Sequence, residues 1–382
     1  MKTQNSERVH VGIFGKTNSG KSTLLNYMTG TDTAIVSNLK GTTTDPIKKA
    51  MEITDFGPVL FIDTAGVGDD TDLGTARESK TKEILDQCDI FIYSLSLDDD
   101  LKFIADIKKT NKPIIYIASK QDIDEGSKII SKYKNLNPIA IDIRNKNDRL
   151  KIFDKIKKLY KKDDLTITKD LVRDGDMVIL VIPQDKAAPK GRLIKPQVMT
   201  IRELIDKNAT AISCDLTNLE KTLHALRDKP DLVICDSQVF KETKEIIEKG
   251  TRLTSFSVLF SAYKGDLDYF VKSVKRFDQP INRVLISEAC THPPIDEDIG
   301  TVKIPRMLRK KYPNIEIEFN RGTDPIDYKR YDLIINCGAC MFNRTTMLSK
   351  VEKAKENNIP MTNYGITIAY LKGILDDIEL PK

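Results

Sequence analysis

The sequence predicts an α/β protein built from three successive domains, each with a mostly parallel sheet. Three observations support this prediction. Short apolar runs alternate with amphipathic stretches along the chain, which is typical of strands and helices in doubly wound sheets. The 382 residues correspond to two or three domains at about 150 residues each. Hydrophobic residues make up 40% and charged residues 31%, as in globular proteins with sizeable cores.

The composition also excludes several classes of protein. There are 61 Lys plus Arg against 56 Asp plus Glu, so the net charge of +5 demands neither nucleic acid nor an anionic membrane as partner. The longest apolar runs, such as 177–183, are far shorter than the roughly 18 residues that span a bilayer. The first ten residues have no apolar stretch of a signal peptide. We therefore expect a cytoplasmic protein whose six cysteines stay reduced.

The first domain is expected at residues 1–165, where apolar runs alternate with helical patterns. A charged segment with few apolar residues follows at 161–176, and we interpret it as a linker. The runs expected to form the parallel strands of the first domain are 9–14, 59–62, 90–94, 113–118 and 138–143.

Two smaller α/β domains are expected at 174–256 and 257–382. In the third domain, apolar residues recur on one face of a helix over 267–277, and a second amphipathic helix includes Met347, Val351 and Ala354. The strands expected in these domains are 177–182, 209–214, 231–236, 283–289 and 332–336, and the helices of the second domain lie within 196–208, 217–226 and 240–250.

A phosphate-binding motif lies at residues 15–22, GKTNSGKS, which fit the pattern GxxxxGKS between a predicted strand and a predicted helix. In that setting the backbone N–H groups of the turn point at phosphate oxygens, and the helix N-terminus adds partial positive charge. Lys21 would neutralise the phosphates, and Ser22 would reach Mg²⁺. The residues of this loop expected to bind a nucleotide are Gly15, Asn18, Ser19, Gly20, Lys21, Ser22 and Thr23.

Further elements follow in the order of a GTPase. In the sequence DTAG, the carboxylate of Asp63 would bind Mg²⁺ and Gly66 would sense the γ-phosphate. The loop GTTTD at 41–45 can supply the hydroxyl of Thr43 to the metal when the γ-phosphate is present. We therefore expect Thr43 and Gly66, together with Lys21, to act in hydrolysis.

The sequence SKQD resembles the element NKxD that reads guanine, so Lys120 and Asp122 are expected to bind the base, with Ser119 in place of the usual asparagine. Together these elements resemble GTPases of the TrmE–Era class, which implies a P-loop GTPase domain that binds GTP and Mg²⁺. In that class, an asparagine at the position of Asn18 and a loop like GTTTD mark enzymes that bind K⁺, which offsets charge in the transition state. The alternative is that Asn18 only forms the turn.

Four possible metal ligands follow the ends of two predicted strands: Cys290 and His292 follow 283–289, and Cys337 and Cys340 follow 332–336. Strand ends of this kind line the ligand crevice of an open α/β sheet. The spacing allows a structural zinc with all four ligands, a redox dithiol, or a 4Fe–4S cluster on three cysteines. The residues alone favour zinc. The other three cysteines lie in or beside apolar runs and are expected to be packed thiols: Cys88, Cys214 and Cys235.

The C-terminal part of the chain resembles the cluster domain of HydF, the family of GTPases that mature FeFe-hydrogenases. The segment 191–206 is similar to the beginning of that family's dimerisation domain, and the order of the three domains also matches. The C-terminal strings that carry the resemblance are EACTHPPIDEDIGTVKIPRMLRK, INCGACMFNR and IPMTNYGITIAYLKGI.

This resemblance implies that Cys290, Cys337 and Cys340 are the thiolate ligands of a 4Fe–4S cluster and that His292 is the histidine of the family's CxH element. The family usually has a histidine before its CxxC pair, where this chain has Asn336. The resemblance further implies a homodimeric GTPase that receives a two-iron precursor from radical-SAM maturases and delivers it to apo FeFe-hydrogenase. The alternative function is a ribosome- or RNA-associated GTPase with a structural zinc site.

Overall fold

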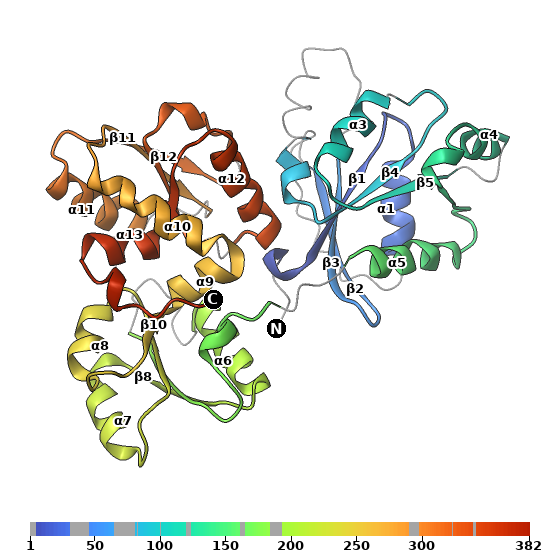
Figure 1. The fold of residues 1–382 in the computed structure, drawn as a ribbon. Helices are drawn as coiled ribbons and strands as arrows, with labels where there is room; N and C mark the ends of the chain where they lie inside the picture. The colour runs from blue at the N-terminus through green and yellow to red at the C-terminus, as the bar shows by residue number, and fades with distance from the viewer. Residues whose placement is uncertain are drawn as a thin grey trace. The chain divides into compact units, whose positions relative to one another are not determined.

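The computed structural model describes residues 5–30, 46–64, 81, 83–99, 101–119, 124–160, 165–183, 193–289, 298–322, 324–338 and 341–382 (Figure 1). The chain divides into two compact units, Met1–Asp163 and Asp164–Lys382.

The first unit contains a six-stranded sheet in the order β2-β3-β1-β4-β5-β6. Only the β2–β3 pair is antiparallel, which confirms a mostly parallel sheet. Strand β2 was not expected from the sequence because IKKAMEI carries three charged residues, as suits an edge strand with a solvated face. The elements are β1 (Val9–Phe14), α1 (Lys21–Thr29), β2 (Ile47–Ile53), β3 (Gly57–Asp63), β4 (Ile90–Ser94), α3 (Leu101–Lys109), β5 (Ile114–Ala118), α4 (Asp124–Lys132), β6 (Ile139–Ala140) and α5 (Asp148–Leu159).

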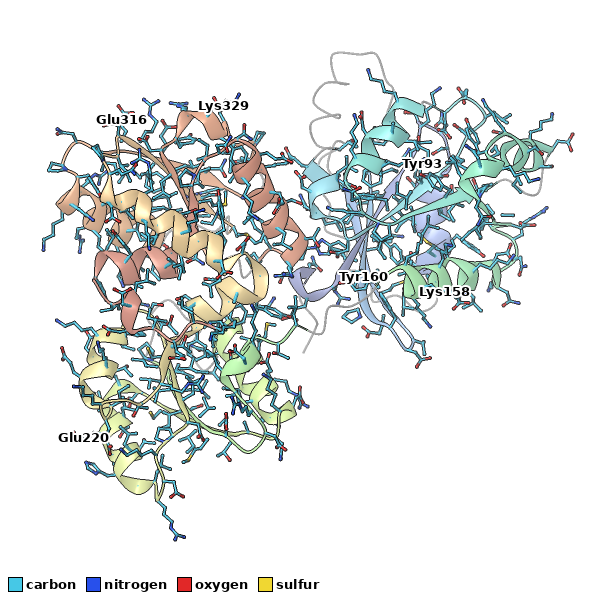
Figure 2. All side chains as sticks on the ribbon, viewed as in Figure 1. Tyr93, Lys158, Tyr160, Glu220, Glu316 and Lys329 are labelled. Carbon is cyan, nitrogen blue, oxygen red and sulfur yellow. The ribbon has the colours of Figure 1, made fainter. Side chains whose placement is uncertain are left out.

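Two apolar cores cover the two faces of this sheet. Helices α1 and α5 supply the first core through residues such as Met28 and Ile152. Helices α3 and α4 supply the second, through Ile107 and Ile129, and Figure 1 shows α1 and α5 on the other side of the sheet from α3. The buried ring of Tyr93 packs near α3 (Figure 2). Because parallel strands covered on both faces need apolar residues on both, they form the continuous apolar runs seen in the sequence.

The second unit contains two four-stranded sheets, β10-β9-β7-β8 and β12-β11-β13-β14, in which all neighbouring strands pair in parallel. This confirms two further α/β sheets after the first domain, whereas the domain boundaries given above stay predictions. The strands are β7 (Met177–Val181), β8 (Thr210–Cys214), β9 (Leu232–Cys235), β10 (Leu253–Ser255), β11 (Arg283–Glu288), β12 (Glu316–Arg321), β13 (Leu333–Asn336) and β14 (Met361–Asn363).

Three of these strands were not expected from the sequence. Strands β10 and β14 are only three residues long, and β12 is an edge strand whose side chains are all exposed or half-buried. Glu316 lies on this edge strand (Figure 2). The longest helix in the described ranges has 13 residues, and none of the described helices could span a bilayer. The helices are α6 (Lys195–Asp206), α7 (Leu219–Ala225), α8 (Phe240–Ile246), α9 (Phe256–Lys264), α10 (Leu267–Val274), α11 (Ile304–Lys311), α12 (Arg344–Glu356) and α13 (Tyr364–Leu371).

Much of the segment expected to be a linker is packed instead. Ile167, Leu171 and Val172 are buried in the core of the first sheet of the second unit. The carboxylate of Glu203 on α6 accepts hydrogen bonds from the backbone N–H of Ile167 and, at 2.8 Å, from that of Thr168. The linker interpretation is therefore wrong for these residues, because their few apolar side chains are enough to attach the segment to the core. Residues 161–164 lie outside the described ranges.

The order in which the chain adds strands to the C-terminal sheet reverses beside β11. From β11 the chain passes to β12 on one side and then to β13 on the other. In such a sheet, ligands bind outside the carboxyl ends of the strands at the point where the strand order reverses. Ser287 pairs with Asn336 in the β11–β13 register, so Cys337 leaves the sheet beside Glu288, the last residue of β11.

Asp332 joins the starts of these two strands. Its carboxylate accepts hydrogen bonds from the backbone N–H groups of Asn282 and Arg283, at 2.8 and 3.0 Å, and from Arg276 at 3.0 Å. Burial would raise the pKa of this carboxyl, but the two backbone N–H groups and Arg276 hold it below its usual value.

We predict that Asp332→Ala lowers the free energy of unfolding by about 1–3 kcal/mol, because two backbone donors lose their acceptor. Since the folded pKa is depressed, this stabilisation is present above the unfolded pKa of about 3.9 and is lost as the pH falls through the folded value. Urea unfolding at pH 7 and below pH 4 measures both effects. Asp327→Ala, at an exposed carboxylate, is the control and should change stability by less than about 0.5 kcal/mol. Equal effects of the two substitutions at pH 7 would contradict the prediction.

Candidate functional site

The phosphate-binding loop follows β1 and is too tightly packed for a side chain at its first glycine. Gly15 has φ +147, and a Cβ there would lie 2.6 Å from both the Ser94 carbonyl oxygen and Ser19 Oγ. Ser94, at the end of β4, also donates a hydrogen bond to the carbonyl of Ser19 at 2.6 Å. Ser19 Oγ is buried and has no hydrogen-bond partner among the described residues. A buried hydroxyl of this kind fits a ligand that supplies the missing partner.

Lys21, Ser22 and Asp63 meet beside this loop. The Lys21 ammonium donates hydrogen bonds to the carbonyls of Gly15 and Lys16, at 3.1 and 2.8 Å. Ser22 Oγ donates to Asp63 Oδ2 at 2.6 Å, whereas Asp63 Oδ1 is buried without a partner in the described part of the chain. Burial raises the pKa of this carboxyl, although Ser22 and Lys21 oppose the rise. A hydroxyl and a half-partnered carboxylate are oxygen ligands that suit Mg²⁺.

The other expected residues of the nucleotide site are only partly described. Asn18 adopts the left-handed conformation, with φ +64, and its side chain is exposed, which fits either a turn or a ligand. Gly20 precedes α1, and a Cβ there would lie 3.7 Å from Ser119 Oγ, so the end of β5 lies beside the loop. Thr23 is the third residue of α1 and is exposed. Four expected residues lie outside the described ranges: Thr43, Gly66, Lys120 and Asp122.

The described part of the cysteine site is Cys337, just past β13. Its Sγ accepts a hydrogen bond at 3.0 Å from the backbone N–H of Ala289, and its own N–H donates to the carbonyl of Ser287 at 2.9 Å. Ala289 immediately precedes Cys290 in the sequence. The residue before one predicted cysteine ligand therefore contacts the sulfur of another. Cys290, His292 and Cys340 are outside the described ranges, within which no group of three His, Cys, Asp or Glu residues forms a metal site.

Three polar side chains lie around Cys337. Asn336 is 2% exposed, and its Nδ2 has no hydrogen-bond partner among the described residues. Tyr364, at the start of α13, donates a hydrogen bond to Glu288 at 3.2 Å. Lys350, on α12, is 8% exposed and donates to Ser287 Oγ at 3.3 Å.

Burial dominates the protonation of these groups. It lowers the pKa of the Lys350 ammonium to about 8, and the negative charge of Cys337 opposes that shift. It raises the pKa of the Tyr364 hydroxyl, and the negative charges of Cys337 and Glu288 add to the rise. Lys350 and Tyr364 are therefore both close enough to interact electrostatically with the sulfur of Cys337.

The expected packing of the other cysteines is confirmed for two of them. Cys88 and Cys235 are completely buried, and burial raises the pKa of both thiols. Cys214, at the end of β8, is half-buried.

Three residues at these sites were not predicted from the sequence: Ser94, Lys350 and Tyr364. Ser94 gives no motif signal, since it only ends an apolar run. Lys350 did give one, because it lies three residues after Met347 and one before Val351, on the apolar face of a helix. Tyr364 reaches the site through the β13–β14 pairing, and β14 was not expected from the sequence.

Three models of known families match parts of the chain. The model described as "Hydrogen maturase F dimerization domain" matches residues 167–265, and "Hydrogen maturase F tetramerization domain" matches 268–379. Together these two models match more than half of the chain. The model "50S ribosome-binding GTPase" matches residues 10–120.

Curated relatives match a shorter part of the chain. GTPase Der of Clostridium kluyveri is 34% identical over 149 residues, which cover 34% of this chain and 32% of the relative. GTPase Der of Clostridium perfringens is 33% identical over 235 residues, which cover 60% of this chain and 47% of the relative. The chain therefore spans about a third to a half of the length of these relatives.

Among solved structures, the G domain of the T. maritima FeoB iron transporter is 22% identical, with a TM-score of 0.33, and covers 41% of this chain and 100% of that one. Aquifex aeolicus Era bound to GDP·AlF4⁻ is 20% identical, with a TM-score of 0.33, and covers 53% of this chain and 91% of that one.

We predict that Ser22→Ala weakens nucleotide binding about tenfold in the presence of Mg²⁺, because the metal loses an oxygen ligand and Asp63 loses its donor. Titration of a fluorescent GDP analogue with Mg²⁺, and again with EDTA, measures the effect. The EDTA titration is the control and should give nearly equal affinities for the variant and the parent. A loss of the same size under both conditions would mean that Ser22 serves the loop rather than the metal.

Proposed function

The chain belongs to the hydrogen maturase F family, and from this premise we propose that it is a GTP-hydrolysing scaffold that binds a 4Fe–4S cluster and delivers a two-iron precursor to apo FeFe-hydrogenase. The main support is the position of Cys337, whose sulfur lies at the switch point of the sheet in a family-specific domain. The phosphate-binding loop in the same chain supports the nucleotide half of the proposal.

In the GTPase domain, Lys21, Ser22 and Asp63 would hold the nucleotide with Mg²⁺. Mg²⁺ would neutralise the negative charge that develops on the phosphate oxygens during hydrolysis. Lys21 adds a fixed positive charge within the loop, and its burial strengthens that effect. Thr43 and Gly66 would respond to the γ-phosphate, and the residues proposed to read guanine are Lys120 and Asp122.

We assign Asn18 a role in binding K⁺ beside the phosphates. Its left-handed backbone and exposed side chain leave the amide oxygen free of hydrogen bonds to the described residues. A monovalent cation held there would offset the charge that an arginine finger offsets in other GTPases.

The cluster would be held by Cys290, Cys337 and Cys340, with His292 beside it. The hydrogen bond from the backbone N–H of Ala289 to Cys337 Sγ supports this set of ligands, because it joins Cys337 to the residue that precedes Cys290. Asn336, the residue before Cys337, has a buried Nδ2 without a partner among the described residues, and this donor is free for a ligand bound there. Amide donors of this kind stabilise thiolate ligands and the clusters they bind. Asn336, in place of the family's usual histidine, leaves the fourth iron open to an exchangeable ligand.

The oligomeric state and the partners are further parts of the proposal. The two maturase domains named for dimerization and tetramerization support self-association as a dimer and beyond it. FeFe-hydrogenase would be the acceptor and radical-SAM maturases the donors. GTP and GDP would alter the affinity for these partners through the loops that contact the γ-phosphate.

A second candidate is a ribosome- or RNA-associated GTPase with a structural zinc site. The match to the model named for ribosome binding favours it. Its zinc site would need thiolates and histidine but no sulfide, so metal analysis separates the two functions.

We predict that GTP hydrolysis is faster in KCl than in NaCl and that Asn18→Ala lowers the rate in KCl to the level in NaCl, because the cation loses a ligand. Phosphate release in the two salts measures this. Asn111→Ala is a matched control, since Asn111 has a similar left-handed backbone, with φ +55 against +64. If Asn111→Ala lost the K⁺ stimulation equally, strain rather than ligation would explain the effect.

We also predict that Cys337→Ser removes most iron and sulfide from the anaerobically reconstituted protein, because the cluster loses one of three thiolates. Metal and sulfide analysis, with EPR of the reduced protein, measures the loss. Cys214→Ser, at a half-buried cysteine of the same unit, is the control and should keep the cluster.

Zinc without sulfide in the parent chain would favour the RNA-associated GTPase. A reversible disulfide that forms between Cys337 and Cys340 and does not need Cys290 would favour a redox dithiol.

A further inference from the structure

We propose that Lys350 is a positioning residue that supplies the positive charge opposite the cysteine-bound cluster and raises its reduction potential. The inference rests on the proposed function, because it needs a cluster at Cys337.

Lys350 contacts described residues next to both cysteine segments. Its ammonium donates hydrogen bonds to Ser287 Oγ at 3.3 Å and to the carbonyl of Gly322 at 3.1 Å, and it lies 4.8 Å from the centre of the Phe342 ring. Ser287 lies three residues before Cys290, and Phe342 lies two residues after Cys340. The ammonium is therefore held at the carboxyl ends of β11 and β12, where Ser287 also accepts the hydrogen bond from the backbone N–H of Cys337.

The charge of Lys350 has no local counterion in the described part of the chain. No described carboxylate lies within 4 Å of its ammonium, and Asp324, which attracts it from farther away, is exposed. A buried ammonium without a counterion costs several kcal/mol, which two neutral hydrogen-bond acceptors and an aromatic ring offset only in part. Such a site is stabilised when a negative group binds beside it.

A negative charge on Cys337 attracts the Lys350 ammonium more strongly than Asp324 does. A cluster held by three thiolates carries net negative charge, and reduction adds one more electron. A fixed cation at short range stabilises the reduced form more than the oxidised form, and hence raises the potential.

The test compares Lys350→Met with Lys353→Met in the full chain, reconstituted anaerobically with iron and sulfide. Lys353 lies three residues farther along the same helix and is exposed, so Lys353→Met removes the same charge from a solvated position. We measure iron and sulfide content and the midpoint potential by EPR-monitored titration. For Lys350→Met we expect full iron content and at least a tenfold shift of the reduction equilibrium toward the oxidised form, about 59 mV for one electron. For Lys353→Met we expect no comparable shift.

Lys350→Gln guards against a simple folding defect, because it keeps a hydrogen-bond donor without the charge. Lys350→Gln should shift the reduction potential as Lys350→Met does. Lys350→Arg keeps the positive charge and should keep the reduction potential of the parent chain. Loss of iron from a folded Lys350→Gln, with full iron in Lys353→Met, overturns the inference, since Lys350 would then retain the cluster rather than set its potential. Full iron with an unchanged potential in Lys350→Met overturns the inference alone. A parent chain that binds no iron overturns the proposed function and this inference with it.

Discussion

The parallel pairing of β11 with β13 is the interaction on which the cysteine site depends. Since the two strands run in the same direction, their carboxyl ends meet at one edge of the sheet, and the register sets Ser287 opposite Asn336. Cys337 then leaves the sheet beside Glu288, the last residue of β11, and the backbone N–H of Ala289 donates to the sulfur of Cys337. Asp332 fixes the opposite ends of the same strands. A shift of this register by one residue would turn the side chains at the strand ends to the other face.

The same rule places the nucleotide site in the first unit. The loop after β1, Asp63 at the end of β3, Ser94 at the end of β4 and Ser119 after β5 all come from carboxyl ends of parallel strands. Both sites also keep buried polar atoms without partners among the described residues: Asp63 Oδ1 and Ser19 Oγ in one, Asn336 Nδ2 in the other. A buried polar atom without a partner destabilises the folded chain, and the proposed ligands would supply partners at these positions.

The central strands and the position of both sites could be predicted from the sequence, for a physical reason. A central parallel strand must be apolar along its whole length, so β1, β7 and β11 are evident, and motifs that follow such strands lie at a common edge. Edge strands such as β2 and β12 are half solvated and give no such signal. Lys350 could be suspected from its place on an apolar helix face, but its contact with Ser287 depends on how α12 packs across the sheet. The segment 167–172 was misjudged because three apolar residues are few in number and yet enough to bury it.

The central claim is that iron binds at the carboxyl ends of β11 and β13. Anomalous scattering at the iron edge, from crystals of the protein prepared without oxygen, tests it most directly. The account predicts one strong iron peak per chain next to the sulfur of Cys337. A peak at the zinc edge alone, or iron located away from these strand ends, would contradict it.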